Sequence, residues 1–172
     1  MSTVKTNQIQ TTGGRTILNS TGSILQVVQV VPSATAVSTS GTGSNAFVVT
    51  TSNSTLVFSG TITPSSSTNK ILCQFKTSAD ANSTGTEEVF CLFRGSTFLA
   101  GNNWYRRVSG SEPQTHHILY LDSPATTSAV QYDIRVATNT SYTVYVNRNS
   151  GNDVSNFWNN NTQLVLMEVA GS

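Results

Sequence analysis

Short apolar runs, separated by Ser, Thr, Asn and Gly, follow one another along almost the whole chain. Apolar and polar side chains alternate in several runs, and Val and Thr are frequent, which is typical of half-buried β-strands. Helical spacing is interrupted everywhere by residues that disfavour helix interiors. The expected strands are residues 24–31, 46–51, 55–63, 70–77, 87–93, 98–100, 104–109, 115–121, 128–137, 142–147 and 163–169.

The order and spacing of these runs predict the fold class. Turn compositions separate neighbouring runs, for example the polar residues 78–86 and a tight hairpin at residues 94–97. Within residues 55–63, Leu56, Phe58 and Ile62 alternate with other residues, so we expect these three to face the core. Many short strands with turns between them indicate an all-β fold, an antiparallel jelly-roll β-sandwich of about ten to twelve strands.

The first 22 residues differ from the rest of the chain. Val4, Ile9, Ile17 and Leu18 are the sizeable apolar side chains there besides Met1, which is too few for a core of their own. Two interpretations stay open, a flexible tail and an arm that orders only against a partner. We therefore divide the chain into an N-terminal arm, residues 1–22, and a β-sandwich head, residues 23–172.

Composition narrows the range of functions. Ser, Thr and Asn together supply 66 of the 172 residues, whereas only 17 residues are charged and the formal net charge is +1. Such a balance gives no electrostatic reason to expect nucleic acid or an anionic membrane as partner. Apolar runs are too short to span a bilayer, and residues 1–14 have no apolar signal-peptide core, so we expect synthesis in a cytoplasm and no membrane insertion.

Candidate catalytic and metal-binding residues are few. Cys73 and Cys91 lie in separate expected strands and read as buried free thiols, with a cross-strand disulfide as the alternative. His116 and His117 are adjacent on one strand, so they face opposite sides of the sheet and cannot form a paired site. Motifs for a nucleophile elbow, a phosphate loop or a metal site are missing. We therefore expect neither catalysis nor a cofactor nor a metal.

Two carboxylates nevertheless merit attention. Asp122 precedes Ser123 and Pro124, which predicts a strand-ending turn in which Asp122 accepts backbone N–H bonds. Glu168 lies in the apolar run 166–169, so we expect it at a sheet edge or paired with an arginine at an interface. If the chain were instead a glycan-cleaving or esterase domain, these two would be the residues to substitute.

Binding is easier to support than catalysis. Both tryptophans fall in aromatic-polar clusters between expected strands, where a flat ring can stack on a sugar while amides bind its hydroxyls. The alternative is that these tryptophans close the ends of the sandwich or a subunit interface. The candidate receptor-contact residues are Asn102, Asn103, Trp104, Tyr105, Arg106, Arg107, Asn156, Phe157 and Trp158.

An ordered series of segments resembles a known group of viral proteins. The segments are residues 5–10 (KTNQIQ), 22–29 (GSILQVVQ), 62–72 (ITPSSSTNKIL), 92–97 (LFRGST), 120–128 (YLDSPATTS) and 166–170 (LMEVA). Together they resemble the small fibre-like or appendage proteins of tailed bacteriophages, especially those of cyanobacteria and other aquatic hosts.

The resemblance implies a homotrimeric jelly roll located on the virion. Its arm would attach to other virion proteins of the capsid, vertex or tail, and its head would contact a host-surface glycan or protein. The function expected is thus a tail or head fibre, with a capsid decoration (cement) protein as the alternative. We expect Val4, Ile9, Ile17 and Leu18 to anchor the arm. Residues 24–31 are apolar on both faces at several positions, so Val28 and Val30 are the expected oligomer contacts.

Overall fold

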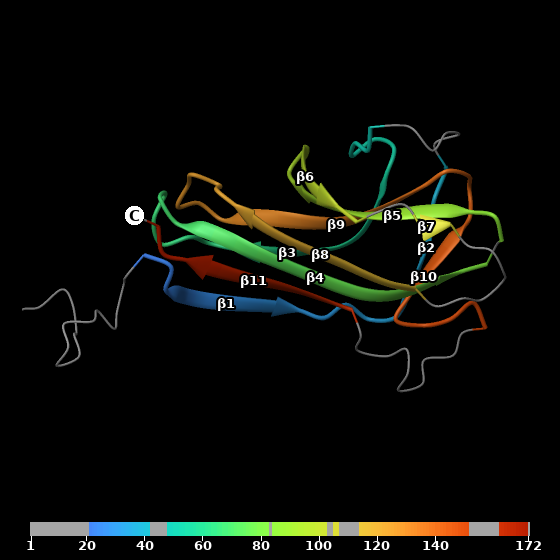
Figure 1. Ribbon diagram of the computed structural model, residues 1–172, viewed down its shortest axis with the longest axis horizontal. Helices are drawn as coiled ribbons and strands as arrows, with labels where there is room; N and C mark the ends of the chain where they lie inside the picture. The colour runs from blue at the N-terminus through green and yellow to red at the C-terminus, as the bar shows by residue number, and fades with distance from the viewer. Residues whose placement is uncertain are drawn as a thin grey trace, which may run out of the picture.

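A computed structural model describes residues 21–41, 48–82, 84–102, 105–106, 114–151 and 162–171, with the backbone alone at 105–106. Its strands form two sheets that lie one over the other and run along the length of the molecule (Figure 1). One sheet has the order β1-β11-β4-β10-β2 with β8 also paired to β4, and the other has β3-β9-β5-β6 with β7 also paired to β5. The strands are β1 Ile24–Val30, β2 Thr35–Ser38, β3 Thr55–Ile62, β4 Lys70–Ala81, β5 Glu87–Arg94, β6 Thr97–Gly101, β7 Tyr105–Arg106, β8 Gln114–Asp122, β9 Val130–Thr138, β10 Thr143–Val146 and β11 Gln163–Val169.

The prediction of an all-β, sandwich-like fold is confirmed. Every regular element in the described ranges is a strand, and all strand pairs are antiparallel. The expected hairpin at residues 94–97 joins β5 to β6, with Gly95 at a positive φ of 59° that glycine adopts without strain. Within the described ranges, none of the elements is a helix long and apolar enough to cross a membrane.

Two expected boundaries are wrong, and side-chain hydrogen bonds account for both. Residues 48–51, the described part of the expected strand 46–51, lie in a loop that runs on through the expected turn 52–54, because the Asn53 amide bonds to Thr50 N and Val48 O and closes the chain on itself. β4 continues through residues 78–81, where we expected a loop, and buries Ala79 and Ala81. Asp80 holds the last residues of this strand, because its carboxylate accepts bonds from Ala81 N and Ser150 N.

The prediction that Leu56, Phe58 and Ile62 face the core is correct only in part. Ile62 is buried and Phe58 packs against the core, but Leu56 is 43% exposed. The cause is a β-bulge, because the pairing of β3 with β9 shifts register between Leu56 and Phe58. A bulge of one residue reverses the face on which all preceding side chains lie.

The main core fills the space between the two sheets. Its largest fully buried side chains include Phe75, Phe90 and Tyr132, and the Phe75 and Phe90 rings lie 5.6 Å apart. A second, smaller cluster lies on the other face of β5, where Val89, Cys91 and Phe93 pack with Ala137 and Val49. β5 is therefore apolar on both faces. Its inner face packs in the main core, and the loop 48–54 and β6 cover its outer face.

Candidate functional site

The structure describes three of the nine predicted receptor-contact residues. Tyr105 and Arg106 form β7, which pairs with Glu88 and Glu87 at the end of β5. Asn102 lies directly after β6 and is half-buried. The other predicted contacts lie outside the described residues: Asn103, Trp104, Arg107, Asn156, Phe157 and Trp158.

Asn102 is held inside the head by its own side chain. Its Oδ1 accepts a bond from Phe90 N at 2.7 Å, which fixes the orientation of the amide, and its Nδ2 lies 2.8 Å from His116 Nδ1. Because the amide nitrogen only donates, His116 Nδ1 accepts, and Nε2 carries the proton that bonds to Glu88 Oε1 at 3.1 Å. This buried chain of bonds joins the two sheets where the predicted receptor loop begins.

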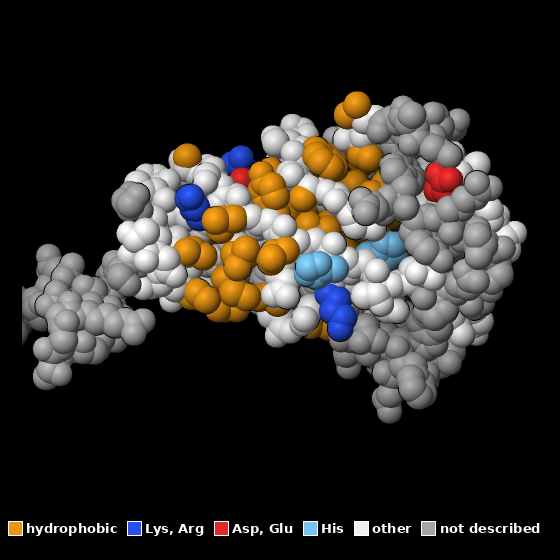
Figure 2. All heavy atoms as spheres, viewed as in Figure 1, with side chains coloured by type: hydrophobic (Ala, Val, Ile, Leu, Met, Phe, Trp, Pro, Cys, Tyr) orange, Lys and Arg blue, Asp and Glu red, His pale blue; other side chains and the backbone are white. Residues whose placement is uncertain are grey.

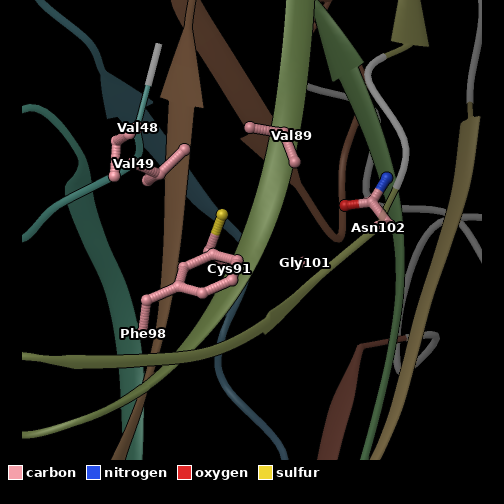
Figure 3. A pocket seen from close by; sticks show the side chains of 7 residues that line it. All are labelled: Val48, Val49, Val89, Cys91, Phe98, Gly101 and Asn102. Carbon is pink, nitrogen blue, oxygen red and sulfur yellow. The ribbon is translucent and has the colours of Figure 1, made fainter.

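A pocket of about 320 Å³ adjoins Asn102 on the outer side of the five-stranded sheet. In Figure 3, Val48 and Val49 lie on one side of it and Val89 and Asn102 on the other, with Cys91 and Phe98 between them. The lining is mostly apolar, and the Asn102 amide is already bonded to Phe90 and His116. This chemistry suits an apolar side chain better than a sugar.

Burial makes both cysteines unreactive. Cys73 and Cys91 are free and buried, as expected from their positions in apolar strands, and the alternative of a disulfide is wrong. Cys73 faces the main core, whereas Cys91 belongs to the outer cluster of β5. Burial raises the pKa of each thiol to about 12, and for Cys73 the nearby Asp122 carboxylate adds to that rise.

Asp122 links the two sheets instead of closing a turn, so the expected bonds to backbone N–H groups are not what the structure shows. Tyr132 donates its hydroxyl to Asp122 Oδ2 at 2.7 Å, and Arg94 Nε lies 3.1 Å from the same oxygen. Burial first, and the bond to Asp122 second, raise the pKa of Tyr132 above its usual range. A carboxylate bonded in this way has a structural position between β8, β9 and β5.

Glu168 has a comparable role two strands away in the same sheet, where it and Asp122 flank Ile71 of β4. Its Oε1 accepts bonds from Ser65 N, Ser65 Oγ and Asn69 Nδ2, and its Oε2 accepts one from Gln26 at 2.7 Å. Burial acts to raise the pKa of Glu168, but these four bonds outweigh it and lower the pKa to about 2. The carboxylate thus joins β1, β11 and the loop 63–69. Neither expected alternative describes it, because β11 lies between β1 and β4 rather than at a sheet edge, and its partners are Gln26, Ser65 and Asn69 rather than an arginine.

The outer side of the six-stranded sheet carries an unexpected apolar surface. Its side chains gather over β1, β11, β4 and β8 (Figure 2). Val27, Leu119 and Leu121 expose 57%, 59% and 47% of their surface. We call this surface the apolar face, and its central residues are Val27, Leu72, Leu119, Leu121, Val165 and Met167.

Of the predicted anchoring and oligomer residues, the structure describes Val28 and Val30, and these two do not lie on the apolar face. Val4, Ile9, Ile17 and Leu18 lie outside the described residues. Val28 and Val30 are half-buried on the opposite side of β1, and Val28 packs against the main core of its own subunit. Their role in a subunit contact stays a prediction.

Sequence reasoning missed the apolar face, although β8 contained the signal for it. Ile118 alternates with Leu119 and Leu121, so the run 115–121 is apolar on both faces and not on one. A surface strand with apolar side chains on both of its faces needs other residues to cover each face. The pocket gave no such signal, because Val48, Cys91 and Phe98 meet only through the tertiary fold.

Comparison with known proteins gives a fold and no family. No protein-family model and no curated protein matches the chain. A solved structure of infectious bursal disease virus, Gt strain, is similar to it with a TM-score of 0.50 and 7% identity, over 98% of this chain and 43% of that chain. A mutant VP2 protein of the same virus, in derived T=1 particles, has a TM-score of 0.44 and 10% identity, over 86% and 37%. The chain spans less than half of those chains, and at 7% identity the likeness shows the fold alone.

Proposed function

We propose that this chain is a structural protein of a virion and not an enzyme. The observation that carries the proposal is the likeness of almost the whole chain, at a TM-score of 0.50, to a protein of a virus particle. The chemistry of the head supports it, because Asp122 and Glu168 are buried and accept bonds from residues of other strands and loops. Assays of turnover on host polysaccharide with the wild type and with Glu168→Gln test the second part, and any turnover lost in the variant contradicts it.

Within that class, the protein is a homotrimeric tail or head fibre of a tailed bacteriophage. In this proposal, the arm of residues 1–22 binds another virion protein, and the jelly-roll head presents the loops around residues 102–107 and 156–158 to a glycan or protein of the host surface. The polar, weakly charged surface fits such a position, because its contacts do not depend on the salt of the medium.

Three experiments test this placement. Removal of residues 1–20 is expected to leave a folded head that no longer joins particles, and incorporation of the shortened protein contradicts the anchoring role. Trp104→Ala with Trp158→Ala is expected to lower adsorption to host cells while the protein stays on the particle. Cryo-electron microscopy of the virion separates a fibre, found at the tail or vertices, from a capsid decoration protein, found on the faces of the shell.

A further inference from the structure

The apolar face consists of two rows that run straight across four neighbouring strands. The strand pairing aligns Val27, Met167, Leu72 and Leu121 in the first row. The second row, aligned in the same way, contains Gln29, Val165, Gln74 and Leu119. Six of these eight positions are therefore apolar, although they lie on the side of the sheet that faces away from the core.

The size of this surface matches the centre of a protein interface. Strands are ~4.8 Å apart and side chains on one face repeat every ~6.8 Å, so these eight positions cover about 260 Å² of sheet. Ile24, which is 56% exposed, and Val169 extend it at one end. A standard interface buries about 800 Å² per partner, of which little more than half is apolar. The apolar face is therefore about one third of what one partner contributes to a standard interface, and half of it, about 130 Å², would form the centre of each contact where two neighbours share it.

The charges at the border of the apolar face restrict how a second copy of the chain could lie on it. Lys70 and Lys76 are both on β4, one on each side of the two rows, and the acids of the same strands, such as Glu168, are buried. If copies met across an axis perpendicular to the strands, Lys70 of one would lie opposite Lys76 of the other. An axis parallel to the strands places β4 opposite β11, so the two lysines meet Val169 and Gln163. Like charges that face each other weaken an interface, which favours the second arrangement.

We propose that the apolar face is the contact between copies of this chain, with the β1–β11 half of one copy against the β4–β8 half of the next, about an axis parallel to the strands. The inference rests on the trimer of the proposed function, for which this axis is threefold. Each contact in such a ring joins the β1–β11 half of one copy to the β4–β8 half of its neighbour. Three copies related by a threefold axis therefore close the ring with every half covered. Thr21, the first described residue, shares a pocket of about 210 Å³ with Lys70, Leu121 and Val169, so the three copies of Thr21 lie at the same end of the trimer.

Engineered cysteines test the arrangement directly. Within one subunit Val27 and Leu121 are three strands apart, roughly 14 Å, which is too far for a disulfide. Between copies the proposed contact brings them together. The double variant Val27→Cys, Leu121→Cys is therefore expected to form covalent species up to the trimer on oxidation. Each single variant is expected to form none, because Cys73 and Cys91 are buried. Cross-linking of Val27→Cys alone overturns the proposed axis.

Charge substitution provides the second test, with a matched control. Leu119→Glu and Leu121→Glu place a carboxylate in the contact and are expected to give folded monomers, measured by light scattering and circular dichroism. Leu56→Glu, at a position 43% exposed on the other sheet, is expected to stay trimeric. A trimeric wild type whose Leu119→Glu and Leu121→Glu variants stay trimeric overturns this contact and leaves the trimer intact. A monomeric wild type at micromolar concentration overturns the trimer as well.

Discussion

Amides and hydroxyls bond most of the buried polar groups of this head. The Glu168 carboxylate is bonded by Ser65, Asn69 and Gln26, and the buried hydroxyls of Thr77 and Thr162 lie 2.6 Å apart. A buried polar group costs free energy unless it is bonded, and a neutral donor satisfies it without a second desolvated charge. The abundance of Ser, Thr and Asn therefore serves the interior as well as the surface.

The first prediction concerns the pH dependence that Glu168 confers. Its pKa is about 2 in the folded protein and near 4.5 in the unfolded chain, so the folded state favours the charged form. The stabilisation, about 3 kcal/mol, is present above pH 4.5 and is lost as the pH falls toward 2. Glu168→Gln is expected to lower the melting temperature at pH 6 and to flatten its fall between pH 5 and 3, as followed by circular dichroism.

Asp133→Asn is the control for that experiment. Asp133 is a half-buried carboxylate on the outer side of β9 that accepts bonds from Ser59 and Gln131. We expect this variant to keep the steep acid transition of the wild type. An equally steep transition in Glu168→Gln would mean that Glu168 is not the group responsible.

At the scale of the element, the bulge in β3 decides which residues stabilise the sandwich. Phe58 packs against the core with its ring 6.2 Å from that of Phe75, whereas Leu56 is largely exposed. Phe58→Ala is expected to lower the free energy of unfolding by about 2–4 kcal/mol, and Leu56→Ala by less than about 1 kcal/mol. Urea denaturation of the two variants measures this difference. Equal losses would contradict the bulge.

Arg135 fixes the loop 48–54 over the outer side of β5. Its guanidinium donates to Ser54 Oγ, Ser54 O and Thr51 O at 2.9, 2.6 and 2.9 Å. We expect Arg135→Gln to loosen this loop and to expose Cys91 behind Val49, which speeds its alkylation by iodoacetamide at pH 8. Cys73 in the main core is the internal control, because it should stay protected. Alkylation of Cys91 at the wild-type rate would show that the loop is held by other contacts.

The strands that sequence reasoning located are those with a run of alternating or β-branched residues. Residues 163–169 form β11 with the bounds expected from the sequence. The errors have two kinds of cause. The Asn53 amide closes the loop 48–54 through local bonds, and the other errors come from contacts between distant segments. Pairing with β9 creates the bulge after Leu56, and the bond from Ser150 N to Asp80 supports the polar end of β4. The residues of the pocket and of the apolar face likewise share no local motif, so the sequence alone did not bring them together.

At the scale of the molecule, both sheets are covered on their inner sides, and the five-stranded sheet is also partly covered outside. Val49 packs on the outer cluster of β5, and Phe98 packs edge-on against Phe93 at 5.5 Å. The corresponding side of the six-stranded sheet has Leu119 and Leu121 exposed. Among the described residues, the chain covers the outer side of one sheet and leaves that of the other apolar, which fits the contact between copies proposed above.

The last prediction follows from how few charges such an assembly uses. Within the described residues, the ion pair of Arg94 with Asp122 and the hydrogen bond of His116 to Glu88 both lie inside one subunit. The proposed trimer contact is apolar at its centre, so raising NaCl from about 0.1 to 1 M, which shortens the Debye length from ~10 to ~3 Å, should leave it intact. Sulfate, which is excluded from protein surfaces, should strengthen it. Sedimentation equilibrium in both salts measures the association constant. A trimer that dissociates in 1 M NaCl would be held by charges, and the apolar face would then not be its main contact.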